Sequence, residues 1–419
     1  MFSIGRYKRI LYSLAVILSG LILPSSCIMK EMADESVRKV VLVYMASEAF
    51  SSYSFANKNI EWMQNSLGSG MDNAALLVYV DKAGLKPCLL RVRRGRTSRD
   101  RGLDTLKIYN EMNSADPDVL RLVIDEVKQQ YPCDSYGLVL WSHGTGWIPQ
   151  SQLKNTELGW KAPKRGGGDN DEPHRLEFDF EGGTKAILVD RTWQSGVAND
   201  TWMEIDDLAG ALHDHEFDFI AFDACYMANV EVLYALRNKT DYIISSGIEI
   251  WGDGFPYFSL TRDLINKNLV KVCESYYKYY SMDYYEPMAG ISLVRTSGLD
   301  SLARCFRKIV ADNDSIGQMN DSIVNAIQSY DWFGNHLFYD LEDFVDKLDT
   351  EYLSEFRLQL DECVMYKNHT PEIFPHTSSK RRALNEYCGM SVFIPLDKFG
   401  DMGLNDAYRE TEWSRDTNY

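Results

Sequence analysis

A cysteine and a histidine, each placed shortly after an apolar stretch, are the residues of this sequence best suited to chemistry. His143 follows the apolar run Gly137–Ser142, and Cys225 comes soon after the run Phe217–Phe222. A cysteine thiol beside an imidazole can act as a nucleophile, with the imidazole accepting its proton. The alternative is a buried structural cysteine and an ordinary histidine, because free cysteine is among the most buried residue types.

The two apolar runs predict how these side chains are positioned. Short runs rich in aliphatic and aromatic residues are typical of strands buried on both faces of a parallel sheet. Neighbouring strands lie about 4.8 Å apart, so His143 and Cys225 would face one crevice at the carboxyl edge of the sheet. Gly144 and Gly146 allow a close approach of the backbone there. A helical pattern follows Cys225, and we expect the N-terminus of that helix to stabilise a thiolate.

Other parts of the chain also predict a parallel α/β organisation. Val40–Met45 and Ala74–Val80 are further buried-strand patterns, and Asp116 with Pro117 predicts the start of an amphipathic helix. A second helix is predicted over Met203–Leu212, before the strand that leads to the cysteine. Such alternation of strands and helices is typical of βαβ units.

The segments around the histidine and the cysteine resemble those of the clostripain family of cysteine peptidases. Members of that family carry a Trp-x-His-Gly-x-Gly-Trp segment, and Trp141–Trp147 reads WSHGTGW. They also carry an Asp-Ala-Cys-x-Met segment, and Asp223–Met227 reads DACYM, with Ala228 in place of the usual glycine. Three further segments are similar to family segments, namely Gly252–Tyr257, Asp340–Phe344 and Gly389–Pro395. The resemblance therefore runs from about Val40 to beyond Pro395.

This resemblance implies a fold and an activity. The fold is a caspase-like α/β architecture with a mostly parallel central sheet flanked by helices. The activity is hydrolysis of peptide bonds by a Cys–His dyad, in which Cys225 attacks the scissile carbonyl and His143 protonates the leaving amine. The N–H groups of Gly144 and Cys225 are the oxyanion hole expected in this family.

The resemblance also implies a substrate preference. Clostripain relatives cleave after Arg or Lys, which requires a carboxylate to receive the basic side chain. The expected partners are therefore protein or peptide substrates with basic residues. Asp223 is the position that the resemblance indicates, and Asp253 is a second candidate. The alternative for Asp223 is a structural role, as a cap of the turn that follows it.

The interval between the histidine and the cysteine is a candidate region for self-processing. Ile148–Thr184 is rich in glycine and mixed charge and is predicted to be a long exposed loop. Clostripain-like enzymes are often cut in this interval, and Lys164 and Arg165 are the predicted sites because the flexible Gly166–Gly168 follows them. The alternative is an insertion without a role in maturation. The sequence itself requires no cofactor and reveals no metal site, whereas the resemblance admits calcium.

The first 27 residues form a targeting segment. A basic start precedes the apolar stretch Ile10–Leu23, and small residues then precede Cys27. This resembles a bacterial lipoprotein signal, with cleavage before Cys27 and acylation of its thiol, except that Pro24 stands where an aliphatic residue is usual. We therefore expect an exported lipoprotein anchored to a membrane of the bacterial cell envelope. Ordinary secretion and an uncleaved anchor are the alternatives.

The rest of the chain is predicted to form one peptidase unit. Residues 28–39 are expected to be a tether, residues 40–400 the catalytic unit and residues 401–419 a C-terminal tail. The formal net charge is −17, which argues against nucleic acid as a partner. Eight cysteines occur without a CxxC pair, and their spacing leaves disulfide pairing open. The alternative function is that of a non-catalytic surface lipoprotein that uses the same fold as a binding module.

Overall fold

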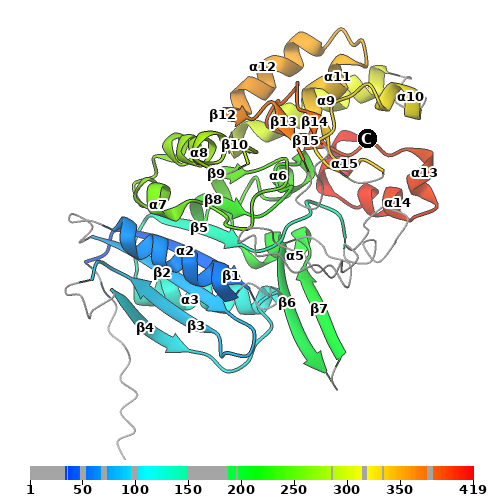
Figure 1. Ribbon diagram of the computed structural model, residues 1–419. Helices are drawn as coiled ribbons and strands as arrows, with labels where there is room; N and C mark the ends of the chain where they lie inside the picture. Colours follow the sequence, from blue (N-terminus) through cyan, green and yellow to red (C-terminus); the bar gives the residue numbers. More distant parts are fainter. Residues whose placement is uncertain are drawn as a thin grey trace, which may run out of the picture.

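A nine-stranded sheet forms the centre of the part of the chain that the structure describes (Figure 1). This computed structural model describes residues 34, 36–47, 53–67, 73–95, 102–149, 187–194, 197–284, 286–313, 319–332, 335–374 and 381–419. The strand order is β12-β10-β9-β8-β5-β1-β2-β3-β4. The central strands run parallel to one another, namely β1 (Lys39–Ala46), β2 (Ala74–Asp81), β5 (Tyr136–Trp141), β8 (Phe217–Asp223) and β9 (Thr240–Ser245). The predicted α/β fold with a mostly parallel central sheet is therefore confirmed.

Antiparallel strands extend the sheet at both edges. β3 (Cys88–Val92) and β4 (Leu103–Ile108) continue it beyond β2, while β10 (Gly290–Arg295) and β12 (Val364–His369) continue it beyond β9. The edge strand β4 is largely exposed, whereas β5 and β8 are buried along almost their whole length. The apolar runs of the sequence thus mark the strands that are covered on both faces.

Helices cover both faces of this sheet (Figure 1). α2 (Tyr53–Ser66), α7 (Tyr257–Ile265) and α8 (Leu269–Lys278) pack on the face that receives alternate residues of β1 beginning with Val41. The opposite face receives the residues beginning with Val40, and it is covered by α3 (Pro117–Gln130), α5 (Ile205–Ala211), α6 (Val230–Ala235) and α9 (Leu299–Asp312). Successive side chains of one strand therefore enter two different cores.

Helix α3 begins as the sequence predicts. The Asp116 side chain accepts a hydrogen bond from the Asp118 N–H at 2.9 Å, and Pro117 occupies the first turn, where its missing N–H has no cost. The apolar residues of this helix recur at helical spacing on its buried face, namely Leu120, Val123, Ile124 and Val127. The capping residues and the apolar face both specify a helix over the same residues, so this element can be predicted from the sequence.

The chain between β5 and β8 differs from the prediction. β6 (Ile187–Gln194) and β7 (Val197–Met203) form a hairpin that extends away from the main sheet in Figure 1. The helix predicted over Met203–Leu212 is shorter, because Met203 ends β7 and α5 begins at Ile205. Strand pairing with β6 decides this boundary, and local propensity does not reveal such pairing.

The C-terminal segment is folded, which corrects the expectation of a tail over residues 401–419. It forms α14 (Leu404–Arg409) and α15 (Glu412–Thr417). Trp413 of α15 is fully buried, with ring centroids 5.1 Å from Phe306 and 5.5 Å from Tyr234. Burial of this large ring offsets the entropy lost when a short, mostly polar segment becomes ordered. The expected tether over residues 28–39 is also partly folded, because Val37 is buried and Lys39 begins β1.

The remaining elements are short. They are α10 (Asp321–Val324), β11 (Tyr339–Asp340), α11 (Leu341–Asp346), α12 (Leu353–Cys363), β13 (Glu372–Ile373), β14 (Arg382–Ala383), β15 (Ser391–Val392), α13 (Asp397–Gly400), a π-helical turn at Tyr279–Asp283 and a 3-10 turn at Thr296–Gly298. Among the helices that the structure describes, none has the length and apolar character needed to traverse a bilayer. All seven cysteines in the described ranges are free thiols.

The buried ring of Trp413 generates a prediction about stability. Trp413→Ala removes a fully buried aromatic side chain and is expected to lower the free energy of unfolding by about 3–5 kcal/mol, measured by urea denaturation. Leu358→Ala is the control, because Leu358 is 66% exposed, and its effect is expected to stay within about 0.5 kcal/mol. Equal stability of the two variants would mean that the C-terminal segment does not contribute to the folded unit.

Candidate active site

The pairing of β5 with β8 brings the predicted histidine and cysteine together. The two strands are parallel neighbours in the register Trp141↔Asp223. His143 and Cys225 each lie two residues beyond this pair, at the same edge of the sheet. The ladder continues past the strand ends, because the Ser142 N–H donates to the Asp223 carbonyl at 3.3 Å. The predicted pairing of these two strands is therefore confirmed, and it brings both residues to one edge of the sheet.

Two glycines after the histidine allow the backbone to reach the cysteine segment. A Cβ atom at Gly144 would lie 2.6 Å from the Cys225 carbonyl oxygen and 2.9 Å from Met227 Sδ. Gly146 has a φ of 67°, and a Cβ atom there would lie 2.2 Å from Asn229 Nδ2. Any larger residue at either position would push the two segments apart, so both glycines of the WSHGTGW segment are required by packing.

The residue after the cysteine adopts an unusual backbone conformation. Tyr226 has a φ of 56°, in the left-handed region that non-glycine residues rarely occupy. Its N–H donates to the Ile248 carbonyl at 3.2 Å, and its ring stacks on Phe338 with centroids 5.2 Å apart. These contacts hold the strained turn, and strain of this kind concentrates at functional sites.

The helix after the cysteine begins later than the sequence suggests. α6 starts at Val230, and the Asn229 side chain caps it by accepting from the Val232 N–H. The Tyr226–Ala228 turn therefore separates Cys225 from the helix end. The predicted stabilisation of a Cys225 thiolate by this N-terminus is wrong, because its effect is confined to the first turn, which Asn229 already occupies.

The Cys225 thiol is held in a neutral state by its surroundings. Burial, with a smaller contribution from the nearby Glu249 carboxylate, raises the pKa of Cys225 to about 12, against the lowering effect of the Ile250 N–H, which donates to Sγ at 3.3 Å. His143 is partly exposed, and its ring lies nearly parallel to that of Trp202 at 6.1 Å. A thiol with this pKa is a weak nucleophile until a base removes its proton.

Asp223 is engaged in holding a turn. Its carboxylate is buried and accepts hydrogen bonds from the Phe255 N–H at 2.9 and 3.0 Å and from the Tyr257 hydroxyl at 2.8 Å. Gly254 has a φ of 65°, and a Cβ atom there would lie 2.8 Å from both carboxylate oxygens. Burial raises the pKa of Asp223 to about 7, against the lowering effect of these bonds. The contacts of Asp223 in this structure are thus structural, but they hold the distant Gly254–Tyr257 turn and not the turn after Asp223 that the alternative named.

Asp253 lies in the same turn and contacts α2. Its side chain is buried and receives the Lys58 ammonium at 2.8 Å on one oxygen and the Tyr284 hydroxyl at 3.3 Å on the other. The Asn59 amide donates to the Asp253 carbonyl at 2.8 Å and accepts from the Trp141 indole N–H at 2.8 Å. Asn59 therefore joins the Asp253 turn to the strand that carries the histidine.

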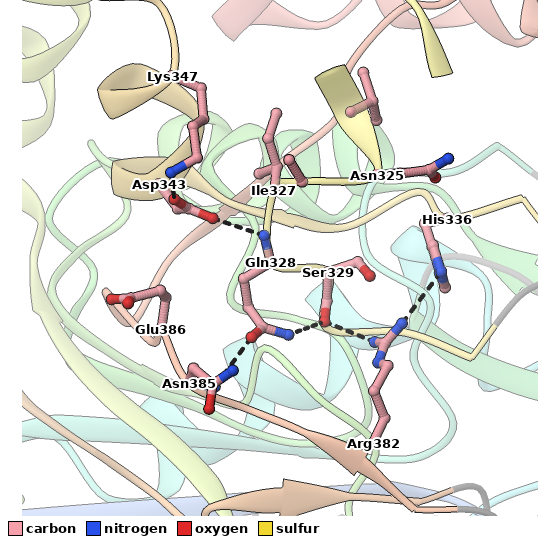
Figure 2. A pocket seen from close by; sticks show the side chains of 12 residues that line it. Asn325, Ile327, Gln328, Ser329, His336, Asp343, Lys347, Arg382, Asn385 and Glu386 are labelled. Atoms are coloured by element: carbon pink, nitrogen blue, oxygen red, sulfur yellow. Dashed lines mark hydrogen bonds and ion pairs between the residues drawn. The ribbon is translucent and has the colours of Figure 1, made fainter. Parts of the chain in front are cut away.

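A polar cleft of about 460 Å³ is lined by the segment Val324–Ser329 and by His336, Arg382 and Asn385 (Figure 2). Figure 2 shows the Arg382 guanidinium between Ser329 and His336, at 2.7 Å from the Ser329 carbonyl and 3.1 Å from His336 Nε2. The buried Asp331 carboxylate pairs with His336 Nδ1 at 2.9 Å and accepts from the Phe338 N–H at 2.8 Å. These bonds hold His336 and Phe338 beside Asp331, and the Phe338 ring stacks on Tyr226.

Three predicted residues fall outside the described ranges. They are Lys164 and Arg165, the predicted processing sites, and Cys27, the predicted lipidation site. Within the described ranges, no three histidine, cysteine, aspartate or glutamate side chains lie close enough to hold a metal ion.

Comparisons with known proteins agree with this architecture. A model of the clostripain family (peptidase family C11) matches residues 43–166 and 183–392. The structure is similar to that of an inactive zymogen C11 protease from Parabacteroides distasonis, with 30% identity, a TM-score of 0.72, and coverage of 91% of this chain and 98% of that chain. It is also similar to a secreted C11 cysteine protease from Bacteroides thetaiotaomicron in complex with an irreversible peptide inhibitor, with 28% identity, a TM-score of 0.71, and coverage of 91% and 99%.

A parallel sheet with a histidine and a cysteine at adjacent strand ends has the layout of a cysteine peptidase. The match over both parts of the chain makes the assignment specific: this chain belongs to the clostripain family. It is also 28% identical to clostripain from Hathewaya histolytica over 158 residues. That match covers 35% of this chain and 24% of clostripain, so the chain spans about a quarter of the length of that relative.

Several residues of the site have no signal in the local sequence. Lys58 and Asn59 lie on a helix that precedes the histidine by more than 80 residues, and their types fit an ordinary exposed helix. Glu249 lies in the loop before the Gly252–Tyr257 segment, and its carboxylate stands out only when Cys225 is placed beside it. A long-range contact cannot be read from periodicity, so sequence analysis misses these residues.

The neutral thiol generates a prediction about reactivity. In the substrate-free protein, alkylation of Cys225 by iodoacetamide is expected to be slow at pH 7 and to rise steadily through pH 10, because its pKa is about 12. Glu249→Gln removes a carboxylate that raises this pKa, so it is expected to speed alkylation about three- to tenfold at one pH. Mass spectrometry identifies the labelled cysteine.

The control for this measurement is Glu126→Gln. Glu126 lies on α3, where its carboxylate pairs with Lys107 and Tyr109. It should leave the labelling rate of Cys225 unchanged. Rapid labelling at pH 6–7 in the parent protein would mean that a thiolate already exists beside His143.

Proposed function

We propose that the protein is a cysteine endopeptidase in which Cys225 is the nucleophile and His143 the general acid and base. The observation that carries this proposal is the register of β5 and β8, because it sets both residues two positions beyond one paired site. The close approach of Gly144 to the Cys225 carbonyl supports it independently.

In this mechanism, His143 accepts the proton of the Cys225 thiol as the sulfur attacks the scissile carbonyl carbon. The carbonyl oxygen becomes an oxyanion, and the N–H groups of Gly144 and Cys225 donate hydrogen bonds to it. His143 returns the proton to the leaving amine, and a thioester forms on Cys225. Water, deprotonated by His143, then releases the acid product and restores the thiol.

The high pKa of the thiol adds a condition to this mechanism. Burial disfavours a free thiolate, so proton transfer to His143 is expected to accompany substrate binding and not to precede it. Substrate that covers the site brings the carbonyl to the sulfur and excludes water from the developing ion pair. The resting protein would then be protected from unwanted alkylation and oxidation.

We further propose that substrates carry Arg or Lys before the scissile bond, with Asp223 and Asp253 providing negative charge for that side chain. Asp223 lies two residues before the nucleophile, and the Asp253 turn wraps around the Asp223 carboxylate through Gly254. The overall charge of −17 adds a field that favours cationic substrates.

Export of the protein and its attachment to the membrane through lipidated Cys27 are also proposals. They are supported by the basic start, apolar stretch and small residues of the first 27 residues. The relative from Bacteroides thetaiotaomicron is a secreted protease, which is consistent with a site of action outside the cytoplasm.

Peptides that differ only in the residue before the scissile bond test the activity and the preference together. The parent protein is expected to cleave after Arg and Lys with a kcat/KM at least about tenfold above that for Ala or Asp. Cys225→Ala and His143→Ala are expected to reduce turnover by about 10³-fold or more, and Asp223→Asn to lose most of the preference. Cys133→Ala, a partly buried cysteine outside the site, serves as the control. Normal turnover by Cys225→Ala would reject the nucleophile.

Self-processing between the histidine and cysteine segments yields a separate prediction. The parent protein is expected to be cut after Lys164 or Arg165, and Cys225→Ala is expected to remain intact, as judged by mass spectrometry of both proteins purified side by side. The inactive zymogen form of the Parabacteroides distasonis relative supports this expectation. Equal cutting of both proteins, or full activity of an uncut chain, would contradict a maturation site.

A further inference from the structure

A lysine of this chain already occupies one of the two carboxylates assigned to the substrate. The Lys58 ammonium lies 2.8 Å from Asp253 Oδ1, while the Asp253 side chain is 7% exposed and that of Lys58 is 36% exposed. The contact joins α2 to a turn almost 200 residues later in the chain. The Lys58 ammonium thus provides Asp253 with the same positive charge that the Arg or Lys side chain of a substrate would provide.

We propose that Lys58 is an internal competitor for the basic side chain of the substrate, an inference that rests on the role given to Asp253 under the proposed function. In the substrate-free protein the Lys58 ammonium neutralises Asp253. When substrate binds, its guanidinium or ammonium displaces the Lys58 ammonium from the carboxylate. Lys58 thereby determines how tightly basic substrates bind, without contacting the reacting atoms.

Among the donors described for the two carboxylates, Lys58 is the cation on a flexible stem, whereas Tyr284, 3.3 Å from the other Asp253 oxygen, is a neutral phenol that can stay in place. Asp223 is held by the Phe255 backbone N–H and by the hydroxyl of Tyr257, which is fully buried. Neither donor can leave without unfolding the turn. Lys58 reaches Asp253 through a flexible four-carbon stem from a partly exposed position, so a change of rotamer is sufficient to free the carboxylate.

Helix α2 stays in place while this side chain moves. Its next residue, Asn59, is fully buried and links the Asp253 carbonyl to the Trp141 indole by two hydrogen bonds of 2.8 Å. The backbone beside Lys58 is therefore fixed to the Asp253 turn and to the histidine strand. Displacement then changes one side chain and leaves the rest of the site intact.

The ammonium already lies beside an aromatic ring, one helical turn further on, that can retain it after displacement from Asp253. Lys58 Nζ lies 4.7 Å from the centroid of the Trp62 ring, at a distance typical of a cation–π contact. Moving toward this ring and the solvent relieves the repulsion between Lys58 and the incoming cation. Exchange of one cation for another on Asp253 also avoids leaving a buried carboxylate unpaired.

The test compares the parent protein with Lys58→Gln on the peptide panel. Removal of the competitor is expected to lower KM for Arg and Lys substrates about two- to fivefold, the range expected for a partly exposed ion pair, with kcat unchanged. The Ala substrate should show no change. Lys58→Arg keeps a cation on Asp253 and is expected to restore a KM near that of the parent. Lys308→Gln is the matched control, because Lys308 pairs with Glu355 at 2.7 Å on the surface.

A binding measurement separates affinity from chemistry. In the Cys225→Ala background, calorimetry with an Arg-containing peptide should give a Kd about two- to fivefold lower when Lys58→Gln is added. If Lys58→Gln fails to fold, as judged by its melting temperature, Lys58→Met keeps the apolar stem on Trp62 and replaces it in both measurements.

The possible failures are distinguishable. If the parent prefers Arg and Lys but Lys58→Gln leaves KM and Kd unchanged or raises them, the inference is overturned and the proposed function stands. If the parent cleaves peptides without any preference for Arg or Lys, the substrate assignment fails, and the competitor role fails with it.

Discussion

The parallel pairing of β5 with β8 is the constraint on which the rest of this site depends. It fixes Trp141 opposite Asp223 and so brings the ends of two segments, 82 residues apart in sequence, to one edge of the sheet. A slip of one residue would turn every side chain of one strand to the other face. The buried apolar side chains on both faces of these strands oppose such a slip, so the core itself maintains the geometry of His143 and Cys225.

Buried acids gather at the same edge of the sheet. Asp81 ends β2 and accepts from the Ser114 hydroxyl at 2.5 Å, and the Ser114 N–H donates to the buried Asp190. Burial raises the pKa of Asp81 to about 7, and that of Asp223 to about 7. Both groups bind their proton more tightly in the folded state, so their contribution to stability falls as the pH rises from about 4 toward 7. Near neutral pH both carboxyls are therefore only partly ionised, and a cationic side chain of a substrate beside Asp223 would favour its ionised form.

Segments from distant parts of the chain hold the nucleophile turn. The Ile248 carbonyl accepts a hydrogen bond from the Tyr226 N–H, and the Ile250 N–H donates to the sulfur of Cys225. Phe338, next to the backbone that Asp331 holds, stacks on Tyr226. The left-handed Tyr226 conformation costs energy by itself, and these contacts compensate for it. Helix α2 also contacts this region. Lys58 forms an ion pair with Asp253, and the Asn59 amide holds the Asp253 backbone by a hydrogen bond.

The sequence by itself determined the α/β class, the strands that end at His143 and Cys225, and the capped start of α3. These features depend on short-range patterns, namely apolar runs, capping residues and glycines at positions where a Cβ atom would collide. The family followed from two short segments whose residue types are specific to their chemistry.

Only the tertiary structure decided the neutral state of the thiol, the structural contacts of Asp223 and the place of Lys58 on Asp253. It also decided that residues 401–419 fold onto the unit through Trp413. Each of these features arises from burial or from contact between residues far apart in the chain. Desolvation and long-range pairing depend on what surrounds a side chain in three dimensions, and a one-dimensional pattern does not contain that information.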